Sequence, residues 1–152
     1  MNATDSNSTL TSDLETLASY VNDSIKGFEK AIQSIHNSAG GTKQLLATMK
    51  DSRERQASLL KDRLETLGQE SDSSGSFKGA SHRALISIQD LFTSSKSTDA
   101  IIHEAIRGEK KLLEHINDTY ADLEAIDSDS HRTVQHLRQD VERSIADLQA
   151  TQ

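Results

Sequence analysis

Hydrophobic side chains recur along the chain at spacings of three and four residues, which is the period of an amphipathic α-helix. Four long stretches share this pattern, at about residues 9–39, 42–67, 98–126 and 129–150. A shorter stretch, at about residues 77–92, repeats it once more. The pattern predicts an all-α fold of four long helices, with a shorter crossover helix between the second and the fourth.

Capping signals place the ends of these helices. Ser12 and Glu15 have the spacing of a capping box, so the first helix is expected to start near Thr9 or Ser12. Gly40 and Gly41 are expected to end it or to form the turn that follows. Ser97 or Thr98 can cap the fourth helix. We therefore expect a disordered N-terminus over residues 1–8, followed by a single domain over residues 9–150.

Two charged residues interrupt the hydrophobic stripes. Glu109 lies near the centre of the apolar face of the fourth helix, and Arg53 lies at the centre of that of the second. An arginine beside a buried carboxylate keeps it ionised and can bond it through two donors. We predict a buried Glu109–Arg53 pair, completed by Gln56 or by one of two tyrosines, Tyr20 and Tyr120. The alternative is that these groups line a small polar pocket or a proton path.

The first and second halves of the helical pattern resemble each other. With Gly27 aligned to Gly108, an offset of 81 residues (108 minus 27), the first helix matches the fourth. With Glu54 aligned to Glu142, an offset of 88 (142 minus 54), the second matches the fifth. This repeat predicts two helical hairpins joined by a crossover, the arrangement of a ferritin-like up-down bundle. Gly27 and Gly108 are expected to let neighbouring helices approach closely.

Composition excludes several classes of function. The chain has no cysteine, so it has no disulfide and no thiolate metal site. Its net charge of −7, with Lys and Arg scattered among acids, argues against nucleic acid or an anionic membrane as the partner. The first eleven residues resemble no secretory signal, and no stretch is long and apolar enough to span a membrane. A cytoplasmic location is the expectation.

Three motifs resemble those of a bacterial ferritin-like four-helix-bundle family of unknown function. They are Asp23-Ser24-Ile25-Lys26-Gly27-Phe28, Gly75-Ser76-Phe77-Lys78-Gly79-Ala80-Ser81-His82-Arg83 and Ile106-Arg107-Gly108-Glu109-Lys110. The resemblance implies a ferritin-like bundle and a role in stress tolerance. It places His82 and Arg83 in a motif of unknown role, where we expect His82 to hydrogen-bond the preceding loop or a neighbouring helix end. Ser24, Ile106 and Lys110 depart from the family pattern, which weakens any transfer of function.

A di-iron or di-manganese site is the functional hypothesis that such a bundle raises. It requires a Glu-x-x-His spacing on two of the helices, and no histidine here has a glutamate three residues before it. Four acids stand where the repeat would place ligands, and we expect all four to face away from the hydrophobic stripes: Asp23, Glu54, Glu104 and Glu142. We therefore expect no cofactor, with iron or manganese as the alternative.

The sequence favours a non-enzymatic helical bundle with a structural or interaction role. A homodimer formed through exposed apolar helix surface is the association we consider for it. The alternative is a metal-binding ferritin-like protein or oxidase.

Overall fold

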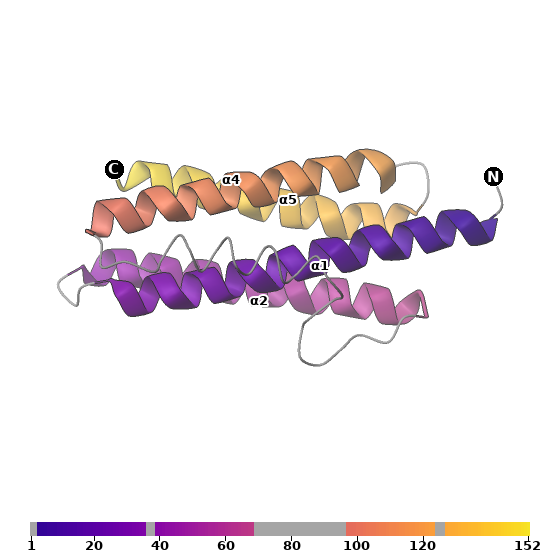
Figure 1. Cartoon of the computed structure of the whole chain (residues 1–152), viewed down its shortest axis with the longest axis horizontal. Coiled ribbons are helices and arrows are strands. Elements are labelled where there is room, and N and C mark those ends of the chain that lie inside the picture. The colour runs from indigo at the N-terminus through magenta and orange to yellow at the C-terminus, as the bar shows by residue number, and fades with distance from the viewer. Residues whose placement is uncertain (1–2, 36–38, 69–96, 124–126) are drawn as a thin grey trace.

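The computed structural model describes residues 3–35, 39–68, 97–123 and 127–152. They form four α-helices and no strand within this part of the chain (Figure 1): α1 (Ala3–Ser34), α2 (Gly40–Thr66), α4 (Thr98–Leu123) and α5 (Ser128–Ala150). The predicted all-α bundle is confirmed for these residues. The shorter helix expected at about 77–92 lies outside the described residues, as do His82 and Arg83.

Helix α1 begins earlier than the capping box predicts, at Ala3 instead of near Thr9 or Ser12. Residues 3–8 contain neither Gly nor Pro, so no residue there interrupts a helix that extends backwards from the buried part. The start of α4 follows the prediction, because the Ala100 N–H donates to the Ser97 hydroxyl oxygen at 3.2 Å. Asp127 caps α5 by accepting a bond from the Asp129 N–H at 3.3 Å.

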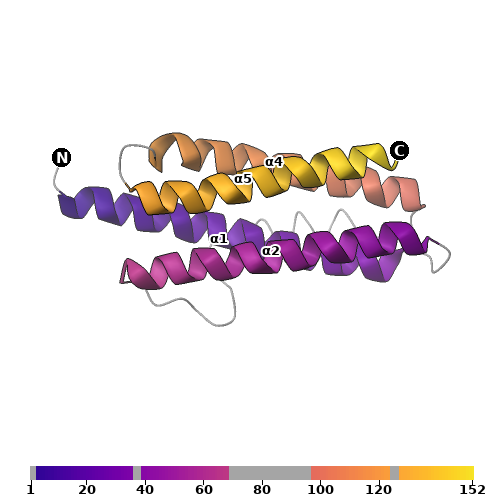
Figure 2. The same ribbon diagram turned by 180° about the vertical axis from the view of Figure 1, so that it is seen from behind.

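The helices form two antiparallel hairpins, α1 with α2 and α4 with α5 (Figures 1 and 2). Helix α1 packs on α2 and α4, and α5 packs on α4 and α2. Helices α2 and α4 therefore lie diagonally across the bundle, and they run in the same direction (Figure 1). We call the two units the α1–α2 hairpin and the α4–α5 hairpin.

In the part of the chain that the structure describes, the core consists of two hydrophobic clusters, one toward each end of the bundle. The first contains Leu10, Leu14, Leu17, Ala18, Val21, Leu60, Leu64, Leu112, Ile116, Val134, Leu137, Val141 and Ile145. The second contains Phe28, Ala31, Ile35, Leu46, Met49, Ile101, Ile102, Ala105, Ile106 and Leu148. Most residues of the predicted stripes are in these clusters, although Ile25 and Leu67 are only half-buried. Fully burying one Val, Leu, Ile, Phe or Met side chain contributes roughly 1.5–3 kcal/mol to the free energy of folding.

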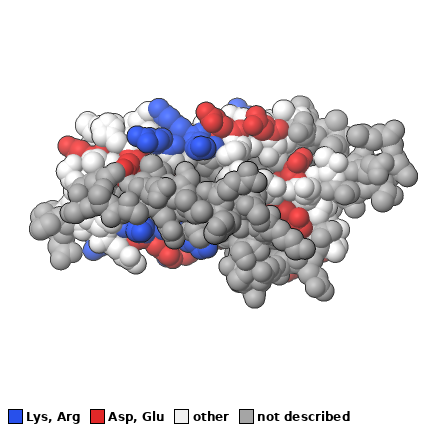
Figure 3. Space-filling model, viewed as in Figure 1, with Lys and Arg blue, Asp and Glu red and all other residues white. Residues whose placement is uncertain are grey.

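The surface mixes both signs of charge. On the face shown in Figure 3, a group of Lys and Arg and a group of Asp and Glu lie next to each other along the upper edge. Among the four helices described, none has the length and apolar character that crossing a membrane requires.

Candidate functional site

Arg53 and Glu109 meet in the middle of the bundle, between the two hydrophobic clusters. The Arg53 Nη2 atom lies 2.5 Å from Glu109 Oε2, and the two side chains are 0% and 3% exposed. The predicted pair is therefore present. It differs from the prediction in one respect: a single guanidinium nitrogen contacts a single carboxylate oxygen, and the other oxygen accepts a bond from a serine.

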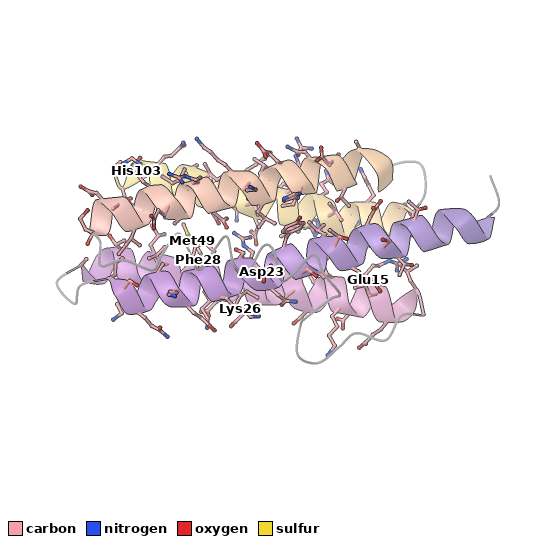
Figure 4. All side chains as sticks on the ribbon, viewed as in Figure 1. Glu15, Asp23, Lys26, Phe28, Met49 and His103 are labelled. Atoms are coloured by element: carbon pink, nitrogen blue, oxygen red, sulfur yellow. The ribbon has the colours of Figure 1, made fainter. Side chains whose placement is uncertain are left out.

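Two serines complete the contacts of this pair. Ser24 Oγ donates to Glu109 Oε1 at 3.2 Å, and Arg53 Nη2 also donates to Ser144 Oγ at 3.1 Å. The guanidinium carbon lies 5.9 Å from the centroid of the Phe28 ring (Figure 4 labels Phe28 with Met49, a member of the same hydrophobic cluster). We call Ser24, Arg53, Glu109 and Ser144 the polar layer. Each of the four helices supplies one of its residues.

Gln56 lies beside the polar layer and bonds a different acid. Its Nε2 donates to Asp140 Oδ2 at 3.1 Å, and Ser52 Oγ donates to the same oxygen. The Ser144 hydroxyl in turn donates to the Asp140 backbone carbonyl at 3.0 Å. Gln56 therefore completes the network around Asp140, not the Arg53–Glu109 pair as predicted.

The two tyrosines proposed as partners of the pair stack on histidines instead. Tyr20 lies parallel to His115, with ring centroids 3.9 Å apart. Tyr120 lies against His131 at 4.3 Å, and Arg138 approaches the Tyr120 ring at 5.0 Å. Burial lowers the pKa of His115, and the charge of Lys111 lowers it further. The partners of the Arg53–Glu109 pair are therefore Ser24 and Ser144, whereas the prediction had named a glutamine or a tyrosine.

Burial raises the pKa of Glu109, and it outweighs the charge of Arg53 and the bonds from Ser24 and Arg53, which lower the pKa. Two guanidinium nitrogens of Arg53, Nε and Nη1, are buried and have no hydrogen-bond partner among the described residues. The described part of the interior thus holds an ion pair in which each carboxylate oxygen accepts a bond, whereas two of the three guanidinium nitrogens have no partner. Every polar contact of the pair goes to another side chain of the bundle.

Asp23 and Glu104 lie where the prediction did not place them. They were expected to face away from the core, yet they are 1% and 8% exposed. Ser19, Asp23 and Gly27 follow one another at four-residue spacing on one face of α1, and all three are buried. The buried part of α1 is therefore wider than its hydrophobic stripe, and small and polar residues at spacing four are the signal that could have indicated it.

Glu54 and Glu142 are exposed, as predicted. Glu54 pairs with Lys50 at 3.1 Å and Glu142 with Arg138 at 3.2 Å, each within one helix turn. Two of the four alternative metal ligands thus lie on the surface while Asp23 and Glu104 are buried. Within the described ranges, no three His, Asp or Glu side chains come together in a group that could hold a metal ion. These four acids do not fit a dinuclear centre.

Gly108 does not serve the close packing that we predicted for it. A Cβ built at Gly108 meets nothing within 4 Å. Gly27 is buried, so close packing there stays a prediction. The two glycines that the repeat aligns therefore have different surroundings.

A second ion pair, missed by the sequence patterns, joins the hairpins near the start of α5. Arg63 Nη2 lies 2.7 Å from Asp127 Oδ2, and Arg63 Nε donates to Ser130 Oγ at 2.9 Å. Ser130 Oγ donates to the same Asp127 oxygen at 2.5 Å. Burial opposes ionisation of Asp127, but the bonds from Ser130 and Arg63 and the charge of Arg63 outweigh it and lower the pKa. Asp127 thus caps α5 and binds α2 at once.

Comparison with known families identifies one relationship. A family model described as a domain of unknown function (DUF2383) matches residues 9–122, three quarters of the chain. The chain belongs to this family. The match includes most of α1, all of α2 and nearly all of α4, and it stops before α5. Comparison with curated proteins and with solved structures gives no match.

Proposed function

We propose that this member of the DUF2383 family is a non-enzymatic helical-bundle protein with a structural or interaction role. The observation that supports the proposal is the bonding of the polar layer. Both oxygens of Glu109 bond side chains of the bundle, Ser24 and Arg53. Glu109 is also buried, so a metal ion or a substrate could reach its carboxylate only by disturbing contacts of the core.

We also propose that the connectivity is ferritin-like. When the second and third long helices of a bundle run in the same direction, one long crossover must connect them. Ferritin-like folds have one such connection. Helices α2 and α4 run in this way (Figure 1), and 29 residues, 68–96, separate Leu67 from Ser97 in the sequence (97 minus 67 minus 1). The motifs of the sequence that resemble a ferritin-like family support the same assignment.

The alternative is a protein that binds iron or manganese, and one observation favours it. Asp23 and Glu104 are both buried, and the offset of 81 that aligns α1 with α4 aligns these two acids with each other. Buried carboxylates are candidates for metal ligands. Their partners in such a site would have to come from α2 and α5, where Glu54 and Glu142 are exposed and paired with cations.

Metal content tests the proposal against this alternative. Protein purified without added metal, and again after loading with ferrous iron or manganese and desalting, is analysed for iron and manganese by mass spectrometry. Glu104→Gln removes the buried acid in question, and Glu142→Gln is the matched exposed control. We expect metal far below one equivalent in all three proteins. One or two equivalents that fall with Glu104→Gln and persist with Glu142→Gln would contradict the proposal.

A further inference from the structure

Within the described ranges, the side-chain hydrogen bonds between the two hairpins share one direction. Among the described residues, each side-chain hydrogen bond between them has its donor on the α1–α2 hairpin and its acceptor on the α4–α5 hairpin. The donors are Ser24, Ser52, Arg53, Gln56 and Arg63, and the acceptors are Glu109, Asp127, Asp140, Ser130 and Ser144. The first hairpin presents two guanidinium groups to the other, and the second presents three carboxylates.

The structure preserves the repeat at the contact between α2 and α5. Ser52 and Asp140 differ by the offset of 88, and they are bonded to each other. A contact between two equivalent positions is what an approximate twofold relation between the hairpins produces. By shape alone, each hairpin could therefore dock on a copy of itself as well as on the other hairpin.

The buried charges prevent such a like-with-like pairing. At the repeat offsets, Glu109 corresponds to Phe28 and Arg53 corresponds to Val141. Two α1–α2 hairpins docked together would place each Arg53 against Phe28, and two α4–α5 hairpins would place each Glu109 against Val141. Both arrangements bury two like charges without a partner, which is strongly unfavourable.

We propose that the inner face of the α1–α2 hairpin is a docking surface specific for an α4–α5 hairpin, including that of a second copy of this chain. The intermolecular form is a dimer in which the two chains exchange hairpins. In the native chain the covalent link gives the internal α4–α5 hairpin a high effective concentration. The monomer is therefore favoured over the exchanged dimer at ordinary protein concentrations. The 29 residues between Leu67 and Ser97 can span up to about 100 Å when extended, so the connection between α2 and α4 is long enough for the exchange.

Two full-length variants test this directly. Glu109→Leu leaves Arg53 without its carboxylate, and Arg53→Leu leaves Glu109 without its guanidinium. The two variants are mixed and refolded together from denaturant. Exchange of hairpins then gives a dimer of two bundles, one with the native Arg53–Glu109 pair and one with Leu at both positions. Neither bundle contains an unpaired charge. The pairing removes the defect of both variants without any new contact.

We expect the mixture to form a 1:1 heterodimer of twice the 16.7 kDa chain mass, detected by light scattering and by capture through a tag on one variant. Its unfolding midpoint should exceed that of either variant refolded alone. The control is the native chain refolded with the double variant Arg53→Leu with Glu109→Leu. Neither of these has an unpaired charge, so exchange gains nothing and both stay monomeric.

A mixture that elutes as monomers with the two separate midpoints would overturn the inference, as would a mixture that does not refold. Dimers formed equally by each variant alone would also overturn it, since they would not depend on the complementary pair. The inference goes beyond the proposed function, and its outcome is independent of it: metal content decides the function, and the mass of the refolded mixture decides the docking.

Discussion

Arg53 and Glu109, 56 residues apart in the sequence, form a 2.5 Å ion pair at the centre of the bundle. Moving both charges out of water costs several kcal/mol, and a well-packed hydrophobic pair of similar volume often supports a fold as well or better. The pair is consequently a poor source of net stability. Its effect is to distinguish the native arrangement of the hairpins from others, because any arrangement that separates the two leaves a charge buried and unpaired.

Gly108→Ala should stabilise the protein. A glycine inside a helix costs roughly 0.5–1 kcal/mol relative to alanine, and a Cβ at this position meets nothing within 4 Å. We expect the free energy of unfolding, measured by urea denaturation, to rise by about this amount. Gly27→Ala is the matched comparison at the buried equivalent position. Destabilisation by Gly108→Ala would show that the helix surface at residue 108 is packed after all.

Asp23→Asn should reveal a pH-dependent cost of burying Asp23. Burial raises the pKa of Asp23 from 3.8 to about 6, although Lys26 lowers it in part. The folded state therefore holds a proton that the unfolded state releases between about pH 4 and pH 6, so this group's contribution to stability falls as the pH rises through that range. Asparagine has no such cost, because it carries no charge at any pH.

The measurement is the difference in free energy of unfolding between Asp23→Asn and the native chain as a function of pH. It should be near zero at pH 4 and favour the variant by on the order of 2–3 kcal/mol at pH 7. A difference that does not change with pH would mean that the Asp23 carboxyl titrates normally in the folded protein.

Asp127 should show the opposite pH dependence. Its pKa is lowered, so its carboxylate adds stability that is present above about pH 4 and is lost as the pH falls below that. Asp127→Ala removes both the helix cap and the partner of Arg63, and it should cost about 1–2 kcal/mol at pH 7. Asp127→Asn keeps a cap and should cost less.

Thermal and urea unfolding of both Asp127 variants check this prediction. The deficit of Asp127→Asn should shrink as the pH falls toward the lowered pKa of the native carboxyl, since that carboxyl then takes up a proton. Equal costs for Ala and Asn at pH 7 would mean that the cap contributes nothing and that only the charge beside Arg63 matters.

The helices and the central pair could be predicted from the sequence because both are local signals. Helical periodicity shows which face is apolar, and a charge at the centre of an apolar face must find a partner of opposite sign. Glu109 and Arg53 were the two charged residues at the centre of an apolar helix face, so each was predicted to be the partner of the other. The cap at Ser97 follows in the same way from the short-range chemistry of serine before a helix.

The rest of the polar network could not be predicted because it depends on how the helices are rotated and shifted against each other. Ser24 and Ser144 are ordinary helix residues in the sequence, and only the docking of the hairpins brings them to Glu109 and Arg53. The burial of Asp23 and Glu104 has the same origin. A hydrophobic stripe identifies one face of a helix, whereas a bundle helix buries surface against two neighbours.

The central claim is that Arg53 and Glu109 act as one structural unit. A double-mutant cycle tests it most directly, with the free energy of unfolding measured at pH 7 for Arg53→Leu, Glu109→Leu and the double variant. Each single change should cost roughly 3–5 kcal/mol because it leaves the other charge buried and unpaired, and the double variant should be close to the native chain or more stable. Single costs that simply add in the double variant would contradict the account.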